Sequence, residues 1–181
     1  MAFEALAVII GFVVGWIKKG SLLQLSSLRT TAVWLLPIAY VSQALSIHLR
    51  NALIYEILIS VSYLLLLSFC VINTSLPGVK WAGVGTFLNF LEMACNGLRM
   101  PAYVPAVRMV EPGALSLLKT GHAGKSVAMD PHTIMPFLGD IIPIRLPFPS
   151  VVSIGDCLFS IGLVLLIVNL MTSNSGDVIN A

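Results

Sequence analysis

Charged side chains are scarce along this chain. Only 10% of its 181 residues are Asp, Glu, Lys or Arg, whereas soluble domains carry about 25%. A polar shell cannot be built from so few charges, and 57% of the residues are hydrophobic. Much of the surface must therefore be apolar and face lipid, which predicts an integral membrane protein. The net charge of +2 gives no argument for binding nucleic acid.

Cysteine and histidine are also rare, which limits metal and redox chemistry. The cysteines fall inside apolar runs and form no CxxC pair, so neither a zinc site nor a redox dithiol is indicated. They are Cys70, Cys95 and Cys157. No two of His48, His122 and His132 have the spacing of three or four residues that a metal site on one helix requires. We therefore expect no cofactor and no metal.

Five apolar runs are candidates to cross a bilayer, which takes about 20 residues with a range of roughly 17–25. They cover residues 2–17, 31–48, 53–72, 81–98 and 151–171. The first run is short, and the basic pair Lys18 and Lys19 follows it instead of preceding it. That order is typical of a retained membrane helix and not of a cleaved signal peptide. The predicted fold class is all-α membrane, with about five transmembrane helices.

The segment 99–150 differs from the rest of the chain. It holds eight of the ten prolines and eight of the 18 charged residues, so no part of it can span lipid unaided. Its apolar residues remain frequent, which indicates a compact extramembrane or partly re-entrant cap and not a linker. The predicted organisation is a four-helix transmembrane part over 1–98, the cap over 99–150, and a fifth helix with a short polar tail over 151–181.

Local patterns predict further structure inside these parts. A Glu-Pro-Gly turn predicts a short helix over 113–119, and residues 126–129 and 133–138 are expected to pair as short strands. In the first apolar run, small residues recur at every fourth position. They are Ala7, Gly11 and Gly15. This spacing lets another helix approach closely, and we expect that helix to belong to the same chain and not to a second copy.

The distribution of basic residues predicts the orientation. Lys and Arg gather in cytoplasmic loops, and short loops carry most of this signal. The loop 18–30 holds three basic residues and the turn 73–80 holds one, against one at 49–52. We therefore expect the N-terminus outside and the C-terminus in the cytoplasm. The cap then lies outside despite its five basic and three acidic residues, because long segments cross largely regardless of charge.

Polar residues of the fourth apolar run share one helical face. Asn89, Glu92, Asn96 and Arg99 recur at spacings of three, four and three. Glu92 lies near the middle of the membrane, where a carboxylate is costly and normally faces the bundle interior. Two interpretations stay open: an acid that handles a proton or a ligand, or a carboxyl that fixes the packing of the helices.

A second polar cluster is predicted at the beginning of the last helix. Asp140 and Asp156 each follow a glycine, where backbone can approach closely. Ser153 suits the N-cap, and Asp156 lies in the first turn, where the helix dipole favours negative charge. One interpretation is capping and turn closure; the other is a polar pocket at the membrane surface in which the acids meet Arg99, Arg108 or Arg145. The full candidate pocket comprises Asn89, Glu92, Asn96, Arg99, Asp140, Arg145 and Asp156.

Several stretches carry a resemblance that runs over most of the chain. They are Lys18-Lys19-Gly20 with the leucine-spaced loop to Arg29, Asn96-Gly97-Leu98-Arg99-Met100-Pro101, Thr133-Ile134-Met135-Pro136-Phe137-Leu138-Gly139-Asp140-Ile141-Ile142-Pro143, Pro147-Phe148-Pro149 and Val152-Ser153-Ile154-Gly155-Asp156. In these stretches the chain resembles a family of small bacterial multi-pass membrane proteins that is classed as a domain of unknown function. The resemblance implies a protein of the bacterial inner (cell) membrane and supplies no reaction.

Three classes of function stay open. The leading one is a non-enzymatic subunit, or a component of a membrane assembly that binds a lipid or small molecule, because no catalytic motif is present. A small transporter or channel component is an alternative, although no inverted repeat is visible. A membrane enzyme acting on a lipid or isoprenoid substrate is a further alternative. The expected partners are membrane lipid, other membrane subunits or a second copy, and no catalytic residue is assigned.

Overall fold

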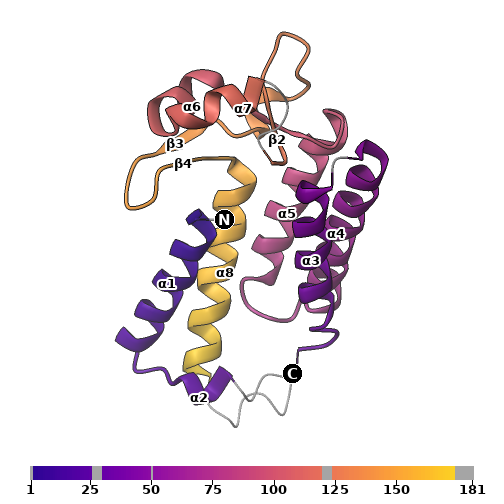
Figure 1. Ribbon diagram of the computed structural model, residues 1–181. Helices are drawn as coiled ribbons and strands as arrows, with labels where there is room; N and C mark the ends of the chain where they lie inside the picture. The colour runs from indigo at the N-terminus through magenta and orange to yellow at the C-terminus, as the bar shows by residue number, and fades with distance from the viewer. Residues whose placement is uncertain (1, 26–29, 50, 120–123, 174–181) are drawn as a thin grey trace.

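The computed structural model describes residues 2–25, 30–49, 51–119 and 124–173, and this part of the chain is mostly helical (Figure 1). Its long helices are α1 (Ala2–Ile17), α3 (Leu35–His48), α4 (Ala52–Ile72), α5 (Val79–Cys95) and α8 (Ile154–Thr172), and a one-turn helix, α2 (Leu22–Leu25), follows α1. Each predicted apolar run overlaps one long helix, with ends that differ by a few residues. The prediction of a helical fold is therefore confirmed.

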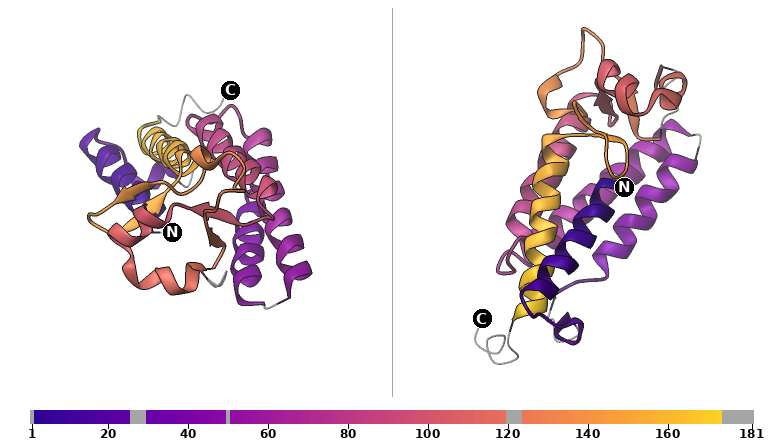
Figure 2. Two further views of the ribbon diagram at one scale, coloured as in Figure 1. Left: turned by 90° about the horizontal axis from the view of Figure 1, so that it is seen from above. Right: turned by 90° about the vertical axis from the view of Figure 1, so that its left-hand side faces the viewer.

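The long helices stand side by side in a single row. α1 packs on α8, α8 on α5, α5 on α4, and α4 on α3, as the view from above shows (Figure 2). The last helix of the chain is thus inserted between the first helix and α5. Most domains bury their apolar faces between two layers, but a single row leaves both faces open. Large apolar side chains are accordingly exposed on every long helix, for example Ile17, Tyr40, Leu53, Phe87 and Ile161.

Two of the described helices are long and apolar enough to cross a membrane, Ala52–Ile72 and Ile154–Thr172. At 1.5 Å per residue α4 is about 32 Å long, close to the thickness of a hydrocarbon core. The apolar helices Phe3–Ile17 and Leu35–His48 are shorter. Helix α5 stops at Cys95, three residues before the end of the predicted run, because Gly97 and Leu98 both take positive φ angles. By length alone two spans are supported, not five.

Backbone meets backbone where α5 crosses α8. A Cβ atom on Gly155 would collide with Asn89 and with the carbonyl of Gly85, and one on Gly162 would collide with the backbone of Gly78 and Ala82. Only a hydrogen atom fits at these points. The two helices therefore approach more closely than larger side chains would permit.

The small residues of α1 pack against the opposite side of α8. A Cβ atom on Gly11 would touch Ile167, and one on Gly15 would touch Met171. Ala7, at the same helical spacing, is buried. Close packing of these residues within the same chain, as predicted from their spacing, is confirmed.

The cap lies across one end of the row (Figure 1). With the two residues that follow it, the cap contains β1 (Met100–Ala102), α6 (Val104–Val110), the 3-10 turn η1 (Pro112–Ala114), α7 (Leu115–Lys119), β2 (Ser126–Ala128), η2 (Pro136–Leu138), β3 (Ile142–Ile144) and β4 (Ser150–Val152). The short helix predicted over 113–119 is confirmed as η1 followed by α7. β3 and β4 form an antiparallel hairpin.

The strand pairing expected between residues 126–129 and 133–138 is wrong. β2 pairs instead with β1, in parallel. Pro136 has no amide proton for a ladder, and its segment closes into η2. The N–H and the C=O of Ile134 are both bonded by the side chain of Asn96, each at 2.9 Å. Since the backbone of this segment is already satisfied, it has no need of a strand partner.

Candidate functional site

The beginning of α8 is fixed by a network of polar contacts. The N–H of Asp156 donates to Ser153 Oγ at 2.9 Å, and the N–H of Ser153 donates to Asp156 Oδ2 at 3.0 Å, which makes a capping box. Asn89 of α5 joins this box. Its Nδ2 donates to Asp156 Oδ1 at 2.7 Å, and its Oδ1 accepts from the Ser153 hydroxyl at 2.8 Å. The capping interpretation of Asp156 is therefore confirmed, and the orientation of its carboxylate is set from two helices.

A cavity of about 220 Å³ lies next to this network, between the first turn of α1, the cap and the beginning of α8. Its described lining carries four carboxylates and one ammonium group. They are Glu4, Glu111, Asp140, Asp156 and Lys125. The hydroxyls of Ser126 and Ser150 and the apolar ring of Phe3 complete much of the wall. The cavity is thus polar and rich in acids, with a single lysine among the described residues that line it.

Asp140 is positioned by its backbone. Its N–H donates to the carbonyl of Pro101 at 2.8 Å, and its carbonyl accepts from the N–H of Tyr103 at 2.9 Å. Gly139 lies so close to Pro101 and Met129 that a Cβ atom there would collide with both. The carboxyl group itself makes no hydrogen bond in the described part of the chain. It is therefore held at the cavity wall with its oxygen atoms free for a ligand.

The charges around the cavity influence one another without direct contact. In the described residues, neither the Lys125 ammonium nor the Asp140 carboxyl has an ion pair or side-chain hydrogen bond. Burial raises the pKa of Asp140 to about 8, and the Asp156 carboxylate adds to this while Lys125 opposes it. The phenol of Tyr63 and the two aspartates raise the pKa of Lys125 above its usual range. Lys125 thus stays charged, and Asp140 can exchange a proton near neutral pH.

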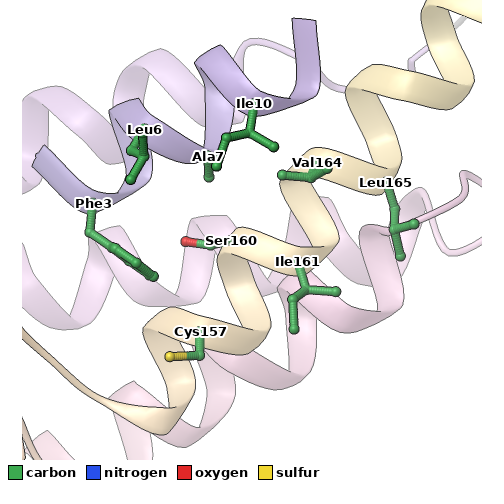
Figure 3. Close-up of a pocket in the computed structure, with 9 residues that line it drawn as sticks. All are labelled: Phe3, Leu6, Ala7, Ile10, Cys157, Ser160, Ile161, Val164 and Leu165. Carbon is green, nitrogen blue, oxygen red and sulfur yellow. The ribbon is translucent and has the colours of Figure 1, made fainter. Parts of the chain in front are cut away.

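An apolar groove of about 410 Å³ runs between α1 and α8 (Figure 3). Phe3 lines both spaces, and Asp156 of the cavity directly precedes Cys157 of the groove. Apart from Cys157 and Ser160, the groove is lined by apolar side chains. They are Phe3, Leu6, Ala7, Ile10, Ile161, Val164 and Leu165. Ser160 is 6% exposed, and its hydroxyl has no hydrogen-bond partner; it points into the space between the two helices (Figure 3).

Glu92 does not line this cavity, although it shares a helical face with Asn89. Its side chain is completely buried, and neither carboxylate oxygen has a hydrogen-bond partner. The stacking of Tyr63 on Phe90, with ring centroids 5.3 Å apart, fixes α4 against α5 next to Glu92. The structure thus separates Glu92 from the two aspartates with which it was grouped as a candidate.

The arginines expected to neutralise the acids lie elsewhere. Arg99 stacks over the ring of Tyr55, 3.9 Å from its centroid, and donates to the carbonyl of Gly124 at 2.7 Å. Arg145 is exposed between β3 and β4. The cation at the cavity is Lys125, which sequence reasoning missed. Lys125 reaches the cavity because β2, which begins at the next residue, pairs with the distant strand β1.

The acids surround the cavity and do not converge on one point. Among the described residues, no three His, Cys, Asp or Glu side chains are close enough together to hold a metal ion. His122 lies outside the described residues.

Comparison with known proteins places the chain in a family. The model of a family of unknown function, DUF5317, matches residues 26–168. The chain belongs to this family. An uncharacterized protein of Thermotoga maritima is 34% identical over 109 residues, and the aligned part spans 59% of this chain and 60% of that relative. No solved structure matches the chain. The DUF5317 match includes the whole cap, and with it Asp140. It also includes Asn89 of α5 and Asp156 of α8, but it does not include α1.

Proposed function

We propose that this DUF5317 protein is a multi-pass membrane protein that binds a lipid-like amphiphile at the cap end of its helix row. The observation that carries the proposal is the junction at Phe3, where the charged cavity adjoins the apolar groove. An amphiphile needs these two environments side by side, one for its head and one for its tail. Taken together, the two spaces are of the size common for small-molecule sites, about 300–1,000 Å³.

The single row of helices supports a membrane location. Exposed apolar side chains on every long helix would form patches that water-soluble proteins avoid. The outer rim of the groove belongs to the same surface, since Ile10, Ile161 and Leu165 line it and are 43%, 50% and 44% exposed. A lipid in the surrounding bilayer would therefore reach the groove from the side, without crossing water.

The tryptophans support the position of one membrane surface. Trp16 lies near the end of α1, Trp34 directly before α3, and Trp81 near the beginning of α5, all at the end of the row away from the cap. They are 54%, 59% and 52% exposed. Tryptophan collects at the headgroup level of bilayers, and Lys18 and Lys80 lie beside these positions. One interface with lipid headgroups is therefore proposed at this end.

The proposed topology has five spans, formed by α1, α3, α4, α5 and α8. The shorter helices would reach the interface through the tryptophan and lysine side chains at their ends. The end with the short basic loops faces the cytoplasm, and the cap and the N-terminus face the outside of a bacterial inner membrane. Two of the basic residues behind this orientation, Arg29 and Arg50, lie outside the described residues.

Lipid retained through purification tests the proposal. The full chain is purified in mild detergent, and lipid per protein is measured by mass spectrometry for the wild type, Ile10→Trp and Ile9→Trp. Both isoleucines are exposed neighbours on α1, but only Ile10 lines the groove. We expect about one tightly held lipid in the wild type and in Ile9→Trp, and its loss in Ile10→Trp.

Two results would contradict lipid binding. One is equal lipid content in all three proteins after extensive detergent exchange, because a site filled by tryptophan should not hold a tail. The other is a stoichiometric protein that co-purifies in place of lipid and is lost in Ile10→Trp. That result would make the groove a subunit interface.

A further inference from the structure

We infer that the occupant is a zwitterionic phospholipid. Its phosphate lies against Lys125, its ammonium group lies among the carboxylates of the cavity, and an ester carbonyl accepts a hydrogen bond from Ser160. This inference rests on the proposed lipid-binding function and specifies the headgroup and the linkage that the site recognises.

Charge complementarity selects the headgroup. A purely anionic head would be repelled by the carboxylates of Glu111 and Asp156, which line the cavity. A purely cationic head would be attracted by them but would offer no anionic group to Lys125, whose ammonium makes no ion pair in the described residues. A head that carries both a phosphate and an amine satisfies both kinds of group.

The state of Asp140 supports this assignment. Its carboxyl group lies at the cavity wall without a hydrogen bond in the described part of the chain, and its pKa is raised to about 8 by burial. A nearby positive charge stabilises a carboxylate. An ammonium group placed in the cavity would add a positive charge beside Asp140, and its N–H groups would donate to this carboxyl group and its neighbours.

Ser160 lies where the ester group between the phospholipid head and its tails would be. It lies four residues beyond Asp156, so its hydroxyl is about 6 Å farther along α8, away from the cap. The side chain is 6% exposed, lines the groove and has no hydrogen-bond partner. A buried donor without an acceptor is costly. Past it the groove is lined by Val164 and Leu165. The order along α8 is thus carboxylate, hydroxyl and apolar wall, the order of head, ester and tail in a phospholipid.

Headgroup selectivity is the first test. The full chain, stripped of lipid by detergent exchange, is titrated with phosphatidylethanolamine and phosphatidylglycerol of identical acyl chains, and bound lipid is counted by native mass spectrometry. We expect at least tenfold tighter binding of phosphatidylethanolamine. Lys125→Gln should weaken its binding, and Asp140→Asn should narrow the difference between the two lipids. Asp130→Asn, the same change at an exposed position of the cap, should leave the binding of phosphatidylethanolamine and the difference between the two lipids unchanged.

The linkage is tested by Ser160→Ala with ester-linked and ether-linked phosphatidylethanolamine. Losing one hydrogen bond to the carbonyl should weaken binding of the ester lipid roughly three- to tenfold, while binding of the ether lipid stays unchanged. An equal effect on both lipids, or none on either, overturns the role of Ser160. Free phosphoethanolamine should not displace the lipid at matched concentration, since it lacks the tail.

The outcomes separate this inference from the function on which it rests. If the two headgroups bind equally, or phosphatidylglycerol binds more tightly, and Ile10→Trp still abolishes lipid binding, the zwitterionic headgroup is wrong. The proposed lipid site is then unaffected. Binding that ignores Ile10→Trp overturns the lipid site itself.

Discussion

Asn89 and Asp156 are joined by a hydrogen bond of 2.7 Å across 67 residues of sequence. The same asparagine accepts a hydrogen bond from the buried Ser153 hydroxyl. One side chain thus ties α5 to the beginning of α8 and orients the carboxylate that lines the cavity. The polar site and the packing of these two helices therefore depend on the same residue.

Replacement of Asn89 by leucine should destabilise the protein by about 2–4 kcal/mol, because the Ser153 hydroxyl and the Asp156 carboxylate each lose one hydrogen bond. Thermal unfolding in detergent measures the change. Thr86→Val, one turn earlier on the same helix, is the control, since the Thr86 hydroxyl bonds only the carbonyl of Ala82 in its own helix. Equal effects of the two substitutions would show that the link between α5 and α8 adds nothing to stability.

The parts of the fold that sequence could predict depend on local patterns. The long helices follow from uninterrupted apolar runs, and the N-cap at Ser153 follows from a motif of four neighbouring residues. The need for glycine at positions 139 and 155 was also expected, and backbone or side chains of distant segments do fill the space beside both. In each case the signal lies within a few residues of the feature.

The parts that sequence could not predict depend on contacts between distant segments. Lys125 reaches the cavity only because β2 pairs with β1. The position of α8 between α1 and α5 cannot be predicted from any single apolar run of the sequence. Arg99 is one of the arginines that the sequence places as possible partners of the acids. The chain bends after Cys95, and the ring of Tyr55 and the carbonyl of Gly124 hold the guanidinium instead.

Gly155→Ala should disrupt the contact between α5 and α8. The added methyl group would collide with Asn89 and with the carbonyl of Gly85, so the helices must separate. Overpacking of this kind costs about 1–3 kcal/mol or more, and it should also weaken lipid retention by moving Asp156. Gly113→Ala in the cap is the control, because nothing lies within 4 Å of its added Cβ atom. Unfolding temperatures that match for both variants would contradict the close approach.

Stability of the lipid-free protein should fall as pH rises, and Asp140 should cause part of the fall. Its pKa is about 8 in the folded protein and about 3.9 in an unfolded chain. Between these values the unfolded state releases the proton more readily than the folded state does. The contribution of Asp140 to the stability of the folded protein is therefore complete below about pH 4 and is lost as pH approaches 8. Lys125, Asp156 and Glu4 act on the same carboxyl group.

Asp140→Asn should therefore reduce the drop in unfolding temperature between pH 5 and pH 8. Asp130→Asn serves as the control, since Asp130 is exposed in a turn of the cap. An unchanged pH profile in Asp140→Asn would show that this carboxyl group ionises alike in the folded and unfolded states.

The topology proposed from the basic loops and the tryptophans should be visible by thiol labelling. Single cysteines replace Ser75, in the turn between α4 and α5, and Ser116 in α7, both of which are exposed. The background carries alanine in place of the three native cysteines. An impermeant reagent on intact cells should label position 116, and position 75 only after permeabilisation. The reverse pattern would invert the orientation, and labelling of both positions would exclude a membrane between them.

Glu92 belongs to the candidate residues predicted from the sequence but does not line the cavity. Because it is buried without hydrogen-bond partners, it lowers the stability of the folded protein. Its side chain has no exposed surface, and both oxygens lack hydrogen bonds. Burying a polar group without a hydrogen bond costs about 1–3 kcal/mol, and an apolar side chain of similar volume avoids this cost. Glu92→Met should therefore raise the unfolding temperature in detergent, whereas Glu92→Gln, which keeps polar atoms in the same place, should gain less.

Lipid binding separates the two interpretations of Glu92. The residue lines neither the cavity nor the groove, so lipid content should be the same in Glu92→Met as in the wild type. A stabilised variant with full lipid content would show that this carboxyl group is retained for a task other than packing or lipid binding, such as carrying a proton within the helix row. A variant that unfolds at a lower temperature would show instead that the carboxyl group holds α5 in place, and the predicted gain in stability would be wrong.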